Sequence, residues 1–301
     1  MTASPAKTNQ QTNQPTNKLI NKFRLYWPLI KSLQTGLLLV TGLAGFMSTR
    51  CPFTNWQTVL ALTGSLFLAV SGSTVLNMWY DRDIDGQMGR TKQRPLPAGL
   101  IPPNEALRLG LVLSLLGVAW AVALDALYGL IVFAGLFFDV VVYTIWLKRR
   151  TPWSIVWGGI SGGMPVLAGR ALGTGQIEWV GIVLSLAVLF WIPTHILTFS
   201  LRYEDDYRRA GVPTFPAVYG RHATHIIIAL SSILAAVMMG MAAYGIGLTW
   251  GYLRLMAVLS TGLLLLAVSS ATKPCERTNF GLFKYASLYM LSAMLLLMFV
   301  V

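Results

Sequence analysis

Long apolar segments dominate this sequence of 301 residues, and each is close to the roughly 20 residues that a helix needs to cross a bilayer. Hydrophobic residues make up 55% of the chain and charged residues only 11%, against about a quarter in soluble domains. This pattern excludes a soluble globular domain, a disordered chain and a coiled coil, and its unbroken runs disfavour a β-barrel. Nine transmembrane helices are predicted, over residues 33–49, 57–80, 104–123, 126–146, 154–173, 179–201, 222–247, 250–270 and 280–301.

We therefore expect an all-α polytopic membrane protein, with a nine-helix domain over residues 27–301 and a disordered cytosolic tail over residues 1–26. The net charge is +12. With the N-terminus in the cytosol, all but three of the 23 Lys and Arg residues lie in or beside cytosolic loops. This asymmetry predicts a cytosolic N-terminus in the cell (plasma or inner) membrane, and basic residues at helix ends indicate contact with anionic lipid rather than nucleic acid.

A first acidic cluster lies at the cytosolic end of the second predicted helix. Asn77, Asp81 and Asp85 are spaced i, i+4, i+8, so they share one face if the helix continues past the membrane surface. Two carboxylates on one face repel each other, and a divalent cation relieves the repulsion. Hard oxygen ligands at a partly aqueous site suit Mg²⁺, which tends to bridge carboxylates and substrate phosphates.

Basic residues follow this cluster directly, in the stretch Arg90-Thr-Lys-Gln-Arg94-Pro-Leu-Pro. Arginine binds phosphate groups in a bidentate manner. Acidic residues, a metal and then basic residues within one loop are what recognition of a diphosphate requires. Any one of these basic residues alone could simply belong to a charged, solvated cytosolic loop. The spacing of the acidic and basic residues together favours a diphosphate site.

A second charged cluster, residues 202–209, ends the sixth predicted helix. Arg202 and Asp206 are spaced i, i+4, so they can pair or share a ligand. The cluster is either a second wall of the metal and diphosphate site or a solvated helix end.

Two ionisable residues lie inside predicted helices. His195 is about two turns inside the sixth, where it either makes a helix–helix hydrogen bond or binds the acceptor, for example through haem iron. Asp139 is about two turns from Lys148, and it is either functional or paired for structural reasons.

These motifs resemble the UbiA superfamily of intramembrane prenyltransferases, and within it the family of protoheme IX farnesyltransferases. The likeness runs from about residue 30 to the end and is carried by residues 77–99, 143–169 and 206–220. It implies a nine-helix bundle in which Mg²⁺ bridges aspartates and the diphosphate of farnesyl diphosphate. The implied acceptor is a vinyl group of haem b, and water completes the addition to give haem O.

The resemblance assigns roles to individual positions. The implied catalytic residues are Asn77, Asp81, Asp85, Arg94 and Asp206. The implied metal ligands are Asn77, Asp81, Asp85 and Asp206. The implied substrate-binding residues are Arg90, Arg94, Lys148, Arg149, His195, Arg202 and Tyr207.

Two features depart from the family. Many members carry a second D-x-x-x-D, but position 202 here is Arg, which implies fewer metal ligands and a contact of Arg202 with phosphate or a haem propionate. The aromatic residues that follow the histidine in many members are absent after His195.

Other functions stay open from the sequence. The same fold can use another acceptor: a quinone precursor, a chlorophyll-type tetrapyrrole or a glycerol phosphate lipid. A secondary transporter is a more distant alternative, disfavoured because transporters place their sites near the midplane of the membrane. The resemblance also makes a haem A synthase or a terminal oxidase a plausible partner.

Overall fold

The computed structural model describes residues 22–49 and 55–299, and these residues form helices and no strand. The long helices are α2 (Ser32–Met47), α3 (Trp56–Tyr80), α5 (Pro103–Leu124), α6 (Ala126–Phe137) with its π-helical continuation η2 (Phe138–Leu147), α7 (Ser154–Thr174), α8 (Trp179–Arg202), α10 (Phe215–Ile246), α11 (Trp250–Thr272) and α12 (Glu276–Met298). Three short elements are η1 (Trp27–Ile30), α4 (Arg82–Gln87) and α9 (Glu204–Arg209).

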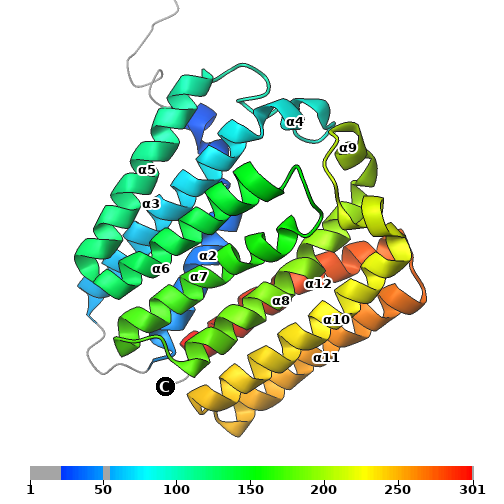
Figure 1. The fold of residues 1–301 in the computed structure, drawn as a ribbon. Helices are drawn as coiled ribbons and strands as arrows, with labels where there is room; N and C mark the ends of the chain where they lie inside the picture. The colour runs from blue at the N-terminus through cyan, green and yellow to red at the C-terminus, as the bar shows by residue number, and fades with distance from the viewer. Residues whose placement is uncertain (1–21, 50–54, 300–301) are drawn as a thin grey trace, which may run out of the picture.

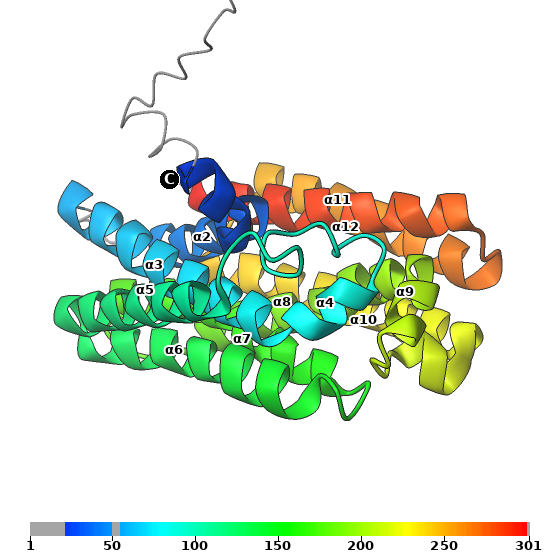
Figure 2. The ribbon, with the colours of Figure 1, turned by 90° about the horizontal axis from the view of Figure 1, so that it is seen from above.

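The long helices form a closed ring in chain order. Each contacts the next from α2 to α12, and α12 returns to α2 (Figure 1). Further contacts, α2 with α7 and α8 with α12, cross the interior of the ring. The short helices α4 and α9 lie together at one end of the bundle, beyond the ends of α3 and α8 (Figure 2).

Within the described residues, seven helices are long and apolar enough to cross a membrane, and an eighth span is formed if Lys22–Ile30 and Ser32–Met47, which meet at 53°, count as one. Their outward faces carry exposed side chains such as Leu115, Leu230, Val258 and Leu265, as lipid contact requires. The one predicted segment outside this count is 154–173, which corresponds to α7. It has the length of a span, but six of its 21 residues are glycine.

The predicted helix boundaries agree with the structure to within a few residues, with one larger difference. The helix predicted to begin at residue 222 begins at Phe215, because Gly220, at φ 80°, bends the chain between a short helical turn and the long segment. Of the predicted tail, residues 1–21 lie outside the described residues. Residues 22–26 are helical, and Leu25 and Tyr26 pack on a cluster around Leu29.

Glycines bring α7 close to α2. A Cβ added at Gly169 would collide with the carbonyl of Gly42, and one added at Gly45 would collide with the carbonyl of Val166. Small residues at such crossings let two backbones touch, which is how membrane helices gain dispersion contacts without help from the hydrophobic effect. The crossing fixes α7 against α2 across the interior of the ring.

Candidate active site

The first acidic motif spans the junction between α3 and α4. α3 ends at Tyr80, and Asp81 (φ −85°, ψ 3°) is the junction residue before α4. Hydrogen bonds from Asp81 N to the Asn77 carbonyl (2.9 Å) and from Asp85 N to the Asp81 carbonyl (2.8 Å) continue the i, i+4 pattern through the junction. The three side chains therefore stay on one side, as the spacing predicts.

A cavity of about 350 Å³ lies beside this junction. It is lined by eight of the predicted site residues: Asn77, Asp81, Asp85, Arg90, Arg94, Lys148, His195 and Tyr207. Three other predicted residues, Arg149, Arg202 and Asp206, are not part of its lining. The structure thus brings together residues from α3, α4, the loop after α4, the end of η2, α8 and α9.

Asp81 is 2% exposed and its carboxylate forms an ion pair with Lys148 through Oδ2. Burial opposes the charge of Lys148, but Tyr143 and the Asp81 carboxylate together outweigh it and raise the pKa of Lys148. The other carboxylate oxygen, Oδ1, is buried without a hydrogen-bond partner, and Arg149 Nη2 is 3.7 Å away. A buried carboxylate oxygen without a partner is costly, so Oδ1 has capacity for a ligand.

Asp85 is held by the basic loop that follows it. Arg94 Nη1 donates to Asp85 Oδ2 at 2.8 Å, and Thr91 Oγ1 donates to the Asp85 carbonyl at 2.8 Å. The sequence-predicted acidic and basic parts of the first motif are therefore in direct contact.

Asn77 is oriented by the π-helical segment. Its Nδ2 donates to Thr144 Oγ1 at 3.0 Å, and Thr144 Oγ1 donates to the Asp139 carbonyl at 2.8 Å. Because Thr144 uses its only proton on a carbonyl, it must accept from the amide nitrogen of Asn77. The amide oxygen of Asn77 is left for the cavity.

A divalent cation fits this set of groups. Asp81 Oδ1 lacks a hydrogen-bond partner, the Asn77 amide presents its oxygen, and the Asp85 carboxylate lines the same cavity. Within residues 22–49 and 55–299, no three His, Cys, Asp or Glu side chains converge as a metal cage. Two carboxylates and one amide are few ligands, which suits Mg²⁺ because it keeps waters and binds substrate phosphates.

Arg90 connects the two motifs through aromatic rings. Its guanidinium lies 4.9 Å from the Phe199 ring centroid, 5.6 Å from that of Tyr203 and 5.4 Å from that of Tyr207. Its Nη2 also donates to Tyr207 Oη at 3.2 Å. Three rings from the end of α8 and from α9 thus fix an arginine that belongs to the loop after α4.

Asp206 holds the two motif loops together. Its Oδ1 accepts from Gly89 N at 3.2 Å and pairs with Arg209. Burial opposes ionisation of Asp206, but the Gly89 N–H and the Arg209 guanidinium outweigh it and lower the pKa of this carboxyl. Arg202 and Asp206, which their spacing allowed to pair or to share a ligand, form no ion pair with each other, because Tyr203 (φ −111°, ψ 29°) breaks the helix between them.

The remaining two predicted residues contact other groups. Arg202 stacks on Phe280, with 4.0 Å between the guanidinium and the ring centroid. Arg149 binds Asp83 with two hydrogen bonds of 2.7 Å, and this contact lowers the pKa of Asp83.

Sequence reasoning missed Lys31 and Tyr143 and left Asp139 undecided, yet all three line the cavity. Asp139 accepts a hydrogen bond from Ser73. Lys31, at the break before α2, is the one non-glycine residue with positive φ (45°) in the described parts of the chain. Its ammonium makes no hydrogen bond or ion pair with a described residue. A lysine at the edge of an apolar segment was the available signal, but only the fold places it in the cavity.

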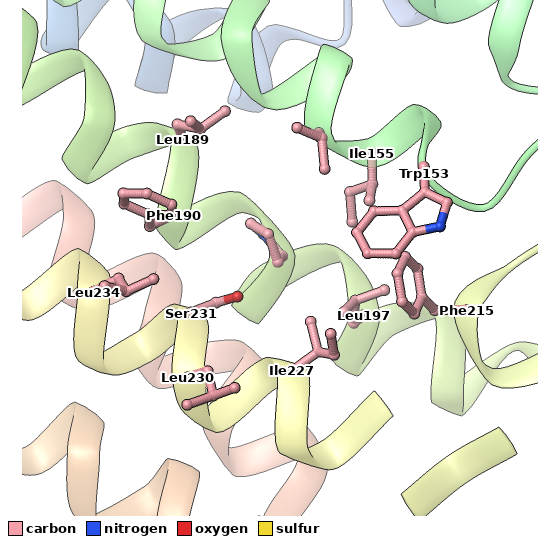
Figure 3. A pocket seen from close by; sticks show the side chains of 12 residues that line it. Trp153, Ile155, Leu189, Phe190, Leu197, Phe215, Ile227, Leu230, Ser231 and Leu234 are labelled. Carbon is pink, nitrogen blue, oxygen red and sulfur yellow. The ribbon is translucent and has the colours of Figure 1, made fainter. Parts of the chain in front are cut away.

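An apolar groove of about 240 Å³ adjoins the charged cavity, and the two share the wall residues Ile155, Leu197 and Phe215. The groove lies between α7, α8 and α10, with Trp153 at one end and Leu234 toward the other (Figure 3). Ser231 is the polar residue in its lining. The site therefore offers a charged end and an apolar extension.

Comparison with known proteins agrees with this arrangement. The profile of the UbiA prenyltransferase family matches residues 38–297. A protoheme IX farnesyltransferase of Pyrobaculum arsenaticum is 42% identical over 258 residues, which are 83% of this chain and 90% of the relative.

Two solved structures share the fold. One, from a study of the biosynthesis of digeranylgeranylglyceryl phosphate synthase in membranes, has a TM-score of 0.77 at 20% identity and covers 93% of this chain and 98% of its own. The other, a UbiA homologue from Archaeoglobus fulgidus bound to GPP and Mg²⁺, has a TM-score of 0.65 at 15% identity and covers 92% and 98%.

Proposed function

Because the chain belongs to the UbiA prenyltransferase family, and is thus a multi-pass membrane enzyme, we propose that it transfers a farnesyl group from farnesyl diphosphate to a vinyl group of protoheme IX (haem b). Addition of water completes the reaction and gives haem O. The observation that carries the proposal is the group of Asn77, Asp81 and Asp85 beside Lys148 and Arg94 in one cavity. The acceptor follows from the 42% identity to a protoheme IX farnesyltransferase.

The charged end of the cavity takes the diphosphate. Asn77, Asp81 and Asp85 would hold Mg²⁺, which supplies positive charge to the departing diphosphate. Lys148 and Arg94 add their own positive charge as the carbon–oxygen bond of the donor breaks. Such preorganised charge is worth most where water is scarce, as at the end of a membrane bundle.

Asp206 has a positioning role in this proposal instead of the metal-ligand role implied by the resemblance. Its carboxylate is already used by Gly89 and Arg209, so it fixes the loop that presents Arg90. Arg149 supports Asp81 from 3.7 Å and orders the α3–α4 junction through Asp83. Arg202 is two turns after His195 on α8, and a contact with a haem propionate remains its predicted role.

Both substrates have large apolar bodies, and the groove beside Ile155 and Leu197 supplies apolar space next to the charged cavity. The apolar walls also keep water from an allylic cation before the acceptor reacts. The secondary transporter that the sequence left open is disfavoured, because the charged residues gather where α3, η2 and α8 end.

The proposal also includes the topology. We place the N-terminus and the active site in the cytosol, at the plasma or inner membrane, and count α7 as a ninth crossing because it lies between α2, α6 and α8. The positive-inside rule supports this orientation. Association with a haem A synthase or a terminal oxidase stays a prediction from the resemblance.

The test is product analysis with the full chain in lipid nanodiscs. We expect haem b, farnesyl diphosphate and Mg²⁺ to yield haem O by mass, and we expect the product to vanish with EDTA or with Asp81→Asn. Asp205→Asn is the matched control, since Asp205 is exposed and lies outside the cavity, and it should keep most of the activity.

Other acceptors test the assignment directly. Transfer to a quinone precursor or to a glycerol phosphate lipid, with none to haem b, would overturn the acceptor while leaving the prenyltransferase chemistry intact. A product that survives EDTA and Asp81→Asn would overturn the metal site.

A further inference from the structure

His195 is the imidazole that lines the cavity, and its ring is held in an aromatic slot. Trp191 lies on one side with 5.0 Å between ring centroids and an interplanar angle of 19°, and Phe283 lies on the other with 4.5 Å and 22°. Stacking on both faces fixes the plane of the imidazole. Only its edges remain available for polar contacts.

One edge is occupied. Ser287 Oγ lies 3.2 Å from His195 Nδ1, and the same Oγ donates to the Phe283 carbonyl at 3.2 Å. With the hydroxyl proton on the carbonyl, Oγ can accept from Nδ1–H, and the His195 ring also donates to the Phe283 backbone. We assign the proton of the neutral ring to Nδ1, the nitrogen that faces Ser287, which leaves a lone pair on Nε2.

The other edge is free. Both polar contacts of the ring, with Ser287 and with the Phe283 backbone, are made to α12. With Nδ1 used there, Nε2 is the nitrogen available to the cavity, whose wall includes His195. A neutral imidazole, with one nitrogen bonded to a fixed partner and the other open, is the usual state of a histidine that ligates a metal.

The surroundings decide which metal. Among the described residues no further His, Cys, Asp or Glu joins His195 in a metal site, so the protein offers a bare ion a single ligand here. An iron tetrapyrrole brings its own four nitrogen ligands and needs one axial ligand from the protein. We infer that His195 Nε2 ligates the iron of the haem acceptor, an inference that rests on the proposed function.

This ligation gives the acceptor a fixed position. An iron–nitrogen bond from a stacked imidazole restrains the plane of the macrocycle. Other contacts must then limit the rotation of the macrocycle about that bond. A vinyl group of the haem can then be held next to the reacting carbon of the prenyl donor. The donor's diphosphate is bound at the end of the cavity that contains Asp81 and Asp85. His195 is therefore a substrate-binding residue, and Ser287 is a positioning residue that acts through it.

The test is haem binding by the full chain in nanodiscs without any prenyl donor. We expect the absorption and EPR spectra of bound haem to show nitrogen ligation in the wild type, and to lose it in His195→Ala. Added imidazole should restore the signature by filling the space left by the side chain. The Kd for haem should rise at least about tenfold in the variant, as loss of a metal contact generally does.

His222→Ala is the matched control, because His222 is exposed on α10 and outside the cavity, and its spectrum should equal that of the wild type. Ser287→Ala should keep ligation but lower the iron–histidine stretching frequency, since the Nδ1 hydrogen bond makes the ligand more basic. Binding of farnesyl diphosphate, measured separately, shows that each variant is folded.

The outcomes separate this inference from the proposed function. If the wild type makes haem O and His195→Ala gives the wild-type haem spectrum, the ligation is wrong and the function stands. If the wild type binds farnesyl diphosphate but neither binds haem nor forms haem O, the acceptor assignment fails and the ligation fails with it.

Discussion

Thr144 sets the direction of the Asn77 amide. The two residues belong to η2 and α3, and the hydroxyl accepts from Asn77 Nδ2 at 3.0 Å while it donates to the Asp139 carbonyl at 2.8 Å. One hydroxyl thereby turns the amide oxygen of Asn77 toward the cavity. Thr144, which lies outside the acidic motif, thus controls the orientation of Asn77, the uncharged metal ligand of that motif.

Thr144→Val should weaken magnesium binding. Valine keeps the shape of the side chain but cannot accept from Asn77, so the amide is free to rotate and its oxygen leaves the metal site. We expect the concentration of Mg²⁺ needed for half-maximal prenyl transfer to rise about 10- to 100-fold, as for other residues that orient metal ligands. Thr144→Ser retains the hydroxyl and should behave as the wild type. An unchanged Mg²⁺ requirement in the valine variant would contradict this role.

Lys148→Met should reduce kcat about 10²- to 10³-fold, because it removes a charge that stabilises the departing diphosphate. Lys148→Arg should fall between this variant and the wild type. Arg150→Met is the control, since Arg150 is exposed, does not line the cavity and removes the same charge from the same loop. Single-turnover measurements of prenyl transfer separate the chemical step from product release. Equal losses in the Met variants at 148 and 150 would point to a general effect of net charge.

Arg90→Lys should weaken donor binding although the charge is kept. Lysine cannot stack its planar group on Phe199, Tyr203 and Tyr207. Loss of about 1 kcal/mol of cation–π interaction corresponds to a roughly fivefold higher KM for the prenyl diphosphate. Arg82→Lys makes the same change at a guanidinium stacked on Trp79 outside the cavity, and its KM should not change. The KM of each variant is measured from initial rates at varied concentrations of the prenyl diphosphate, and an equal KM change in both variants would contradict the role of Arg90.

Acid should destabilise the contact between the two motif loops. The pKa values of Asp206 and Asp83 are lowered in the folded protein, so the unfolded chain binds protons more readily. Their contribution is fully present above the unfolded value of about 3.9, and it is lost as the pH falls through the lower folded values. The melting temperature in detergent should therefore fall between pH 5 and pH 3.

Asp206→Asn isolates the larger part of this acid effect, because Asp206 is buried and Asp83 is exposed. The variant should have a lower melting temperature than the wild type at pH 7 and a smaller difference at pH 3. Asp205→Asn, an exposed neighbour that forms no ion pair within the described residues, should follow the wild-type pH curve. Parallel curves for Asp206→Asn and the wild type would contradict the assignment.

Hydrophobic length predicted where the long helices lie, because burial of the backbone in lipid leaves a chain few alternatives, while seven of them, or eight with the bent pair, meet the criteria for a span within the described residues. The i, i+4 spacing also predicted the common side of Asn77, Asp81 and Asp85. The same spacing failed for Arg202 and Asp206, since no local signal marks Tyr203 as the residue where helix α8 ends. Spacing describes neighbours on a continuous helix, and one non-helical residue removes that relation.

Contacts between distant segments were beyond the sequence. The π-helical turn over 138–147 reads as ordinary apolar helix, yet its wider turn places Lys148 against Asp81 and Thr144 against Asn77. Lys31 and Tyr143 enter the cavity only through the packing of α2 and η2 on α3. Such residues carry no motif, because their role depends on which helices become neighbours.

The glycine contacts between α2 and α7 have a consequence for how the protein is made. Because α7 contains six glycines and Arg170, its transfer from the translocation channel into lipid alone is unfavourable. Gly42 and Gly45 on α2 offer it a protein surface in place of lipid, and α2 is synthesised first. Correct placement of α7 is thereby tied to α2, so a larger residue at Gly42 would harm biogenesis before it harmed catalysis.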